Sequence, residues 1–154
     1  MEIISADSSG IILQNSDVWF VAVRRTDKQK HTGVHISHEY QVRMRIRLQK
    51  NWVEKLSAIL YYKVIKTLLE ESDCIQIDKD FLGKRARFVL KYLEILFLVY
   101  RQSSPTIEFL SERKSRFIKE AHVKTKAARY KTIKVDQDPI IDEEVECLKN
   151  YKLK

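Results

Sequence analysis

Glycine and proline are scarce in this chain, with three glycines and two prolines in 154 residues. All-β sandwiches and barrels need many tight turns, and tight turns depend heavily on these two residue types. The shortage therefore argues against a turn-dense all-β fold and favours longer strands and helices. The hydrophobic share of 44% is ordinary for a globular protein, so an intrinsically disordered chain is also excluded.

Cysteine is rare as well, and long apolar runs are absent. Cys74 and Cys147 stand far apart in no metal-binding spacing, and no signal peptide is visible. We therefore expect free thiols, no disulfide-linked partner and a cytoplasmic location. The most apolar stretch, residues 89–100, is interrupted by Lys91 and Glu94 and is too short to cross a bilayer. It predicts a core helix, and we expect no membrane partner.

Several signatures of enzymes are missing. The chain has no Walker loop, no glycine-rich dinucleotide loop and no Ser-His-Asp order. His31, His35 and His38 lie close together, but no cysteine is near them. On a strand, His35 and His38 would face opposite sides, so a zinc site is disfavoured.

Positive charge is what the chain has in excess. Lys and Arg number 29 against 21 Asp and Glu, which gives a formal net charge of +8. A surplus of this size favours a polyanionic partner, of which nucleic acid is the commonest. A lysine-rich surface that only keeps the protein soluble is the plain alternative. The length predicts one domain over residues 1–154, and a homodimer stays open.

Hydrophobic periodicity predicts a mixed α/β domain. Residues 33–48 show the clearest alternation, with Val42, Met44, Ile46 and Leu48 placed between arginines, which predicts a half-buried strand. Strands are expected over residues 2–7, 17–25, 33–48, 74–81 and 106–110, and helices over 51–71, over 83–100 and from 138 onwards, after a basic segment at 112–134. We therefore expect a five-stranded sheet, with three antiparallel strands and then two parallel ones, flanked by helices.

The element order and one short motif resemble the ribonuclease-H-like superfamily, which includes ribonuclease H, Holliday-junction resolvases and transposases. The motif Ala6-Asp7-Ser8-Ser9-Gly10 is similar to the Asp-x-Ser-Gly opening of several branches. The resemblance implies that the first and fourth strands lie side by side at the centre of the sheet. Each would end on a carboxylate, here Asp7 and Asp78.

The resemblance further implies a metal-dependent nuclease that acts on RNA or DNA phosphodiesters. Asp7, Asp78 and Asp142 of the last helix would be its catalytic and metal-binding acids, with Asp138 and Glu54 as further candidate ligands. Carboxylates held together repel one another, and Mg²⁺ or Mn²⁺ ions relieve that repulsion. Such ions also activate water and stabilise the leaving oxygen of a phosphodiester.

Each acid also has a simpler explanation. An Asp before Ser-Ser-Gly is typical of a turn, which accounts for Asp7, and Asp78 lies in a charged triplet typical of a surface. The helix dipole favours acids in a first turn, which accounts for Asp142 and Glu54. Helix capping accounts for Asp138.

Three groups of basic residues are candidates for phosphate contacts. Arginines at every second position of a strand would project from one face at steps of about 7 Å, close to the phosphate spacing of a single strand. A second group opens a helix, and a third is interleaved with His122 and Tyr130, which suits occasional base stacking. The groups are Arg43, Arg45 and Arg47; Lys84, Arg85 and Arg87; and Lys124, Lys126, Arg129, Lys131 and Lys134. A solvated face or a flexible loop would show the same composition.

Two functions therefore compete. One is a divalent-metal-dependent nuclease, and the other is a non-catalytic module on the same fold that holds nucleic acid or a ribonucleoprotein. Convergence of Asp7, Asp78 and an acid of the last helix would favour the nuclease, whereas a last helix docked elsewhere would favour binding. A protein-interaction domain with incidental charge is a weaker third option.

Overall fold

The structure is a computed structural model that describes residues 3–9, 12, 16–24, 30–70, 73–78, 85–102, 105–110, 116–131 and 133–153. Lys84 of the second basic group and the side chain of His122 lie outside the described parts. The elements in chain order are β1 (Ile3–Ser9), β2 (Val18–Arg24), β3 (His31–Ile36), α1 (His38–Leu48), α2 (Trp52–Lys66), β4 (Cys74–Asp78), α4 (Ala86–Arg101), β5 (Thr106–Leu110), α5 (Arg116–Arg129), β6 (Asp136–Gln137) and α6 (Asp142–Leu148).

The strands form one mixed sheet in the order β5-β4-β1-β2-β3-β6. β1, β2 and β3 pair antiparallel in succession, while β4 pairs parallel with both β1 and β5. The predicted α/β class is therefore confirmed, but the described sheet has six strands where five were expected. The extra strand, β6, pairs parallel with β3 and is only two residues long, too short for periodicity to reveal it.

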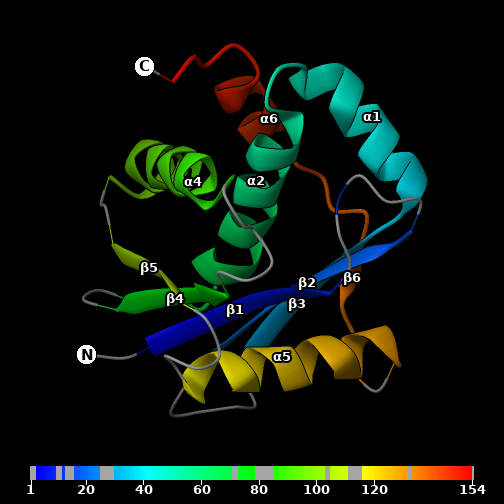
Figure 1. Cartoon of the computed structure of the whole chain (residues 1–154), viewed down its shortest axis with the longest axis vertical. Coiled ribbons are helices and arrows are strands. Elements are labelled where there is room, and N and C mark those ends of the chain that lie inside the picture. The colour runs from blue at the N-terminus through cyan, green and yellow to red at the C-terminus, as the bar shows by residue number, and fades with distance from the viewer. Residues whose placement is uncertain are drawn as a thin grey trace.

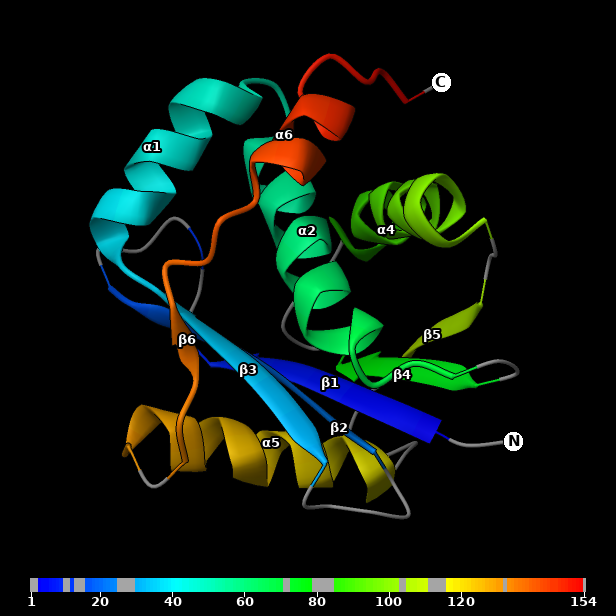
Figure 2. The ribbon, with the colours of Figure 1, turned by 180° about the vertical axis from the view of Figure 1, so that it is seen from behind.

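Helices cover both faces of the sheet (Figures 1 and 2). Of the described helices, α1, α2, α4 and α6 lie on one side and α5 lies on the other. The larger core fills the space between the sheet and the four helices, and Phe20 is fully buried in it. A smaller core joins Val21 and Val23 of β2 to Ala121 and Ala128 of α5. The short side chains of these alanines allow α5 to lie close to the strands.

The prediction of one strand over residues 33–48 is wrong for the residues that follow β3. The chain turns into α1, whose first turn is capped by Ser37 Oγ, which accepts a hydrogen bond from the backbone N–H of Tyr40. Tyr40, Met44 and Leu48 are buried at four-residue steps, as a helix requires. Ile46 belongs to the same alternating row but is 71% exposed. The arginines of the first basic group therefore lie on a helix and not along one face of a strand.

Two further expectations change at the end of the chain. The basic segment 112–134 contains the helix α5, and the last helix begins at Asp142 and not at Asp138. Asp138 has a φ of 41° and caps α1 through Ser37 instead of starting a helix of its own. The predicted strands at 2–7, 17–25, 74–81 and 106–110 and the helices at 51–71 and 83–100 are confirmed where the structure describes them, apart from small shifts of their described ends. Residues 2, 25, 71, 79–81, 83 and 84 of these predictions lie outside the described residues.

Candidate functional site

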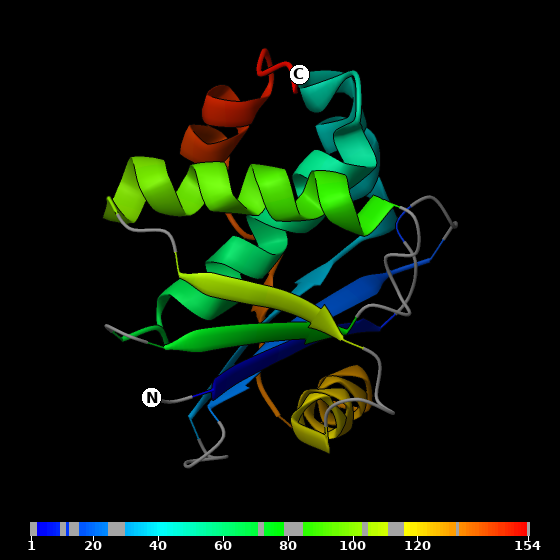
Figure 3. The same ribbon diagram turned by 60° about the vertical axis from the view of Figure 1, so that its left-hand side comes forward.

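The centre of the sheet places Asp7 and Asp78 in neighbouring positions. β1 and β4 are parallel neighbours whose pairing runs to Ala6 opposite Ile77, so the next residue along each strand is an aspartate. Residues in register on neighbouring strands point to the same face and lie about 5 Å apart. Figure 3 shows β1 and β4 side by side, with α5 across the sheet from α4.

These two aspartates are on the α5 face of the sheet. Asp7 lies opposite Val21, and facing residues of antiparallel strands share a face. Val21 belongs to the small core under α5. Asp78 follows Ile77, which packs in the large core on the other side, and successive side chains of a strand alternate between faces. Asp7 is 1% exposed and Asp78 is 8% exposed, so neither carboxylate is displayed on an open surface.

The hydroxyl of Tyr61 on α2 lies on the opposite face of the sheet, beside β1. It is 3.2 Å from Oγ of Ser8, the residue after Asp7 in β1. Burial raises the pKa of Tyr61, the charges of Asp7 and Asp78 raise it further, and the hydrogen bond with Ser8 opposes them. The middle of the sheet therefore carries buried polar groups on both faces, the two aspartates towards α5 and the pair of Ser8 and Tyr61 towards α2.

The acids of the final segment lie elsewhere. Oδ1 of Asp142 is 2.8 Å from Nη1 of Arg47 in an ion pair between α6 and α1. The carboxylate of Asp138 accepts hydrogen bonds from the backbone N–H and the hydroxyl of Ser37, at 2.8 and 3.0 Å. α6 packs against α1, α2 and α4, on the side of the sheet opposite α5. The structure therefore does not bring Asp142 or Asp138 to the pair, because the apolar stripe of α6 is buried in the four-helix layer.

Glu54 has a partner of its own as well. It lies in the first turn of α2, where its Oε1 is 3.0 Å from Nε of Arg85 at the start of α4. The part of the chain that the structure describes contains no group of three or more His, Cys, Asp or Glu side chains able to hold a metal ion. Asp7 and Asp78 are the right kind of donor for Mg²⁺ or Mn²⁺, but none of the other predicted acids completes the set.

The arginines of α1 contact three different partners. The guanidinium of Arg43 is 5.8 Å from the ring centroid of Tyr40, and that of Arg45 is 5.9 Å from that of Trp52. Arg47 forms the ion pair with the α6 aspartate described above. Arg43 and Arg45 remain exposed, but the three side chains do not form the evenly spaced row that a strand would have produced.

The outer face of α5 is basic. Lys126 and Arg129 are exposed, and Tyr130, directly after the helix, is 74% exposed. Lys131 and Lys134 continue the exposed positive charge, while Lys124 is half-buried and Arg87 is exposed on α4. The described side chains of α5 include no acid. Because α1 and α5 lie on opposite sides of the sheet, the first and third basic groups form two separate surfaces (Figure 2).

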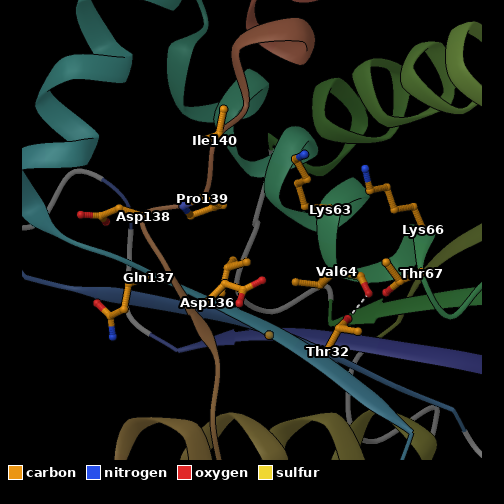
Figure 4. A pocket seen from close by; sticks show the side chains of 12 residues that line it. Thr32, Lys63, Val64, Lys66, Thr67, Asp136, Gln137, Asp138, Pro139 and Ile140 are labelled. Carbon is orange, nitrogen blue, oxygen red and sulfur yellow. Dashed lines mark hydrogen bonds between the residues drawn. The ribbon is translucent and has the colours of Figure 1, made fainter.

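A cavity of about 620 Å³ opens beside the edge formed by β3 and β6 (Figure 4). Lys63 and Lys66 of α2 border it on one side, and Asp136 and Asp138 border it on the other. Lys63 is paired with Glu144 of α6 at 3.1 Å. The lining has mixed charge and includes neither aspartate of the central pair, so this cavity is not their entrance.

A second cavity of about 620 Å³ was missed by reasoning from the sequence. It lies where α1 and α6 end and α2 begins, and it is bordered by Lys50, Lys55, Lys149 and Lys152. These lysines come from two distant parts of the chain. The sequence signal for this cavity was the short run from Lys149 to Lys152, which mixes basic and aromatic residues as nucleic-acid-binding segments do.

Comparison with protein-family models, curated proteins and solved structures finds no match to this chain. Both cysteines are free, and burial raises the pKa of the Cys74 and Cys147 thiols, as expected of unreactive thiols. Within the described residues, none of the helices has the length and apolar character needed to cross a membrane.

Proposed function

We propose that this chain is a nucleic-acid-binding protein with a ribonuclease-H-like architecture. The neighbouring positions of β1 and β4, the antiparallel β1-β2-β3 unit and the parallel β4-β5 pair support this architecture. The docking of α6 on the far side from the aspartate pair favours binding over catalysis.

The outer face of α5 is the observation that carries the proposal. α5 rests on the sheet through small side chains and directs Lys126 and Arg129 to solvent, next to the exposed ring of Tyr130. Cations attract phosphates, and an exposed ring offers a platform on which a base can stack. At 74% exposure the ring of Tyr130 is open to such stacking, beside the cations that would hold the backbone.

Fluorescence anisotropy with labelled RNA, DNA and hybrid duplexes tests this proposal. The triple variant Lys126→Gln, Arg129→Gln and Lys131→Gln should weaken binding by at least about tenfold at low salt. The slope of log affinity against log salt should fall by about 2 for a single strand, from roughly 0.7 per lost phosphate contact.

The double variant Arg43→Gln and Arg45→Gln removes exposed charge from the opposite side of the protein and serves as the control. It should reduce affinity much less than the α5 variant. Losses in proportion to the charges removed, three in the α5 variant and two in the α1 variant, would show that only net charge matters, and the proposed surface would then be rejected.

A metal-dependent nuclease is the second candidate, because Asp7 and Asp78 are adjacent and buried on one face. Two carboxylates in such a place need positive charge near them to stay ionised. They would hold a Mg²⁺ or Mn²⁺ ion, which supplies activation of water and stabilisation of the leaving oxygen. The sheet would hold the two carboxylates rigidly in place.

Calorimetric titration with Mn²⁺, followed by cleavage assays on labelled RNA, DNA, hybrid and branched duplexes, tests the nuclease. Asp7→Asn and Asp78→Asn should each remove the heat of binding and any cleavage. Asp142→Asn is the matched control, since its carboxylate pairs with Arg47, and it should leave both signals intact. Heat that persists in Asp7→Asn, or a native protein that cuts none of these substrates, would rule this candidate out.

A further inference from the structure

The second cavity described above is a lysine-rich groove lined in part by the C-terminal tail, and its lining includes neither the aspartate pair nor any residue of α5. The cavity at the ends of α1 and α6 contains four lysines and no acid among its lining residues. It is lined by Gln49, Lys50, Asn51, Lys55, Lys149, Asn150, Tyr151, Lys152 and Leu153. Four like charges around one hollow repel each other, and an anion in the hollow removes that repulsion.

Lys55 builds the floor of this groove. It is 2% exposed, and its Nζ donates hydrogen bonds to the carbonyl oxygens of Leu48 and Lys149, at 3.2 and 3.0 Å. These carbonyls belong to the C-terminal ends of α1 and α6, where the helix dipoles are negative. Burial lowers the pKa of Lys55, while the two carbonyls give its ammonium group partners. Lys55 therefore joins the two helix ends and places Lys50 beside Lys149.

A neighbouring cavity of about 510 Å³ extends the groove towards α4. The two cavities share Tyr151, Lys152 and Leu153, and the second adds Lys91 together with the apolar side chains of Ile95 and Leu98. Glu94 is the acid among its lining residues. Figure 1 shows the C-terminal tail leaving α6 on the side of α4, and the tail residues that both cavities share connect them.

We propose that this groove binds single-stranded nucleic acid, with backbone phosphates at Lys50, Lys149 and Lys152 and a base against Tyr151. Basic side chains interleaved with an aromatic ring are the usual construction of a single-strand site. Lys149 also pairs with Glu146 at 3.0 Å, but an exposed ion pair of this kind is weak and can exchange with a phosphate. The inference rests on the proposed function and adds a second contact surface to it.

The test uses a labelled homopyrimidine strand of about 12 nucleotides, a typical length for such sites. The triple variant Lys50→Gln, Lys149→Gln and Lys152→Gln should weaken binding of the strand at least about tenfold and lower the salt slope by about 2. Tyr151→Ala should weaken it about tenfold with little change of the salt slope, because stacking involves no counterion release. Thermal unfolding of each variant should match that of the native protein.

The triple variant of Lys126, Arg129 and Lys131 on α5 removes the same charge and separates the two proposals. If the groove variant binds the strand as the native protein does while the α5 variant does not, the groove is rejected and the proposed function stands. If the native protein binds no nucleic acid, both are rejected. Inorganic phosphate or polyglutamate that displaces the strand from the native protein at equal charge concentration would also overturn the groove as a nucleic-acid site.

Discussion

Replacement of Asp7 by Asn probes the centre of the sheet most directly, because Asn keeps the size of the side chain and removes its charge. The two carboxylates occupy neighbouring register positions in a buried place. Two negative charges about 5 Å apart repel each other by roughly 3 kcal/mol at an effective dielectric constant of about 20. If a divalent cation binds there, the stability of the native protein should respond to the metal and that of Asp7→Asn should not.

The size of this response follows from linkage. At a Mn²⁺ concentration about 100 times the Kd, bound metal adds about 2.7 kcal/mol to the free energy of unfolding. For a domain of this length, 1 kcal/mol changes the Tm by about 2–4 °C, so the Tm of the native protein should rise by roughly 5–10 °C. Asp7→Asn should rise by less than about 2 °C.

Thermal unfolding followed by circular dichroism, in a chelator and then in increasing Mn²⁺, measures both quantities. Asp142→Asn should behave as the native protein does, since that carboxylate is bound to Arg47 on the other side of the sheet. A native Tm that does not move with Mn²⁺, or an equal rise in Asp7→Asn, would refute the idea that these strands form a cation site.

Three more outcomes follow from particular contacts. Folding raises the pKa of Tyr61 above its ordinary value of 10.0, so above pH 10 this group should lower the free energy of unfolding of the native protein by up to about 1.4 kcal/mol per pH unit. In urea unfolding from pH 8 to 11, Tyr61→Phe should therefore lose stability less steeply than the native protein. The same variant should be about 1 kcal/mol less stable at pH 7, where only its hydrogen bond with Ser8 is missing. Lys55→Met should cost about 2–4 kcal/mol in urea unfolding at pH 7, since two helix-end carbonyls lose their donor. Asp138→Ala should cost about 1–2 kcal/mol and reduce the helical circular dichroism signal, because Ser37 loses the acceptor that anchors the start of α1.

The sequence pattern alone predicted an element correctly where its apolar residues are also the residues that the fold buries. The run of five residues at Thr106–Leu110 is β-prone and follows a proline, and it forms β5 with the predicted bounds. α2 begins at Trp52 after Asn51, as its apolar spacing indicated, although Asn51 makes no side-chain cap and donates instead to the hydroxyl of Tyr92. In such segments the periodicity of the apolar residues directly predicts which face of the element is buried.

The segment of α1 shows where the local signal is ambiguous. Met44 and Leu48 are four residues apart, a spacing that fits both one face of a strand and one face of a helix. The exposed Val42 and Ile46 made the strand the better match by pattern alone, and only the packing of α1 against α2 and α6 shows which side chains are buried. Because of that packing, Arg43 lies on the exposed side of a helix and not in a row along one face of a strand.

The amino-acid sequence by itself determined the α/β class, the positive charge and the presence of acids at the ends of two predicted strands, because these depend on composition and on neighbours along the chain. The tertiary structure decided which acids meet. The register of β1 on β4 aligns Asp7 with Asp78, whereas the burial of the apolar stripe of α6 takes Asp142 to Arg47 on the opposite side of the sheet. The lysine groove also depends on the tertiary structure, since Lys50 and Lys149 become neighbours only when two helix ends are joined through Lys55.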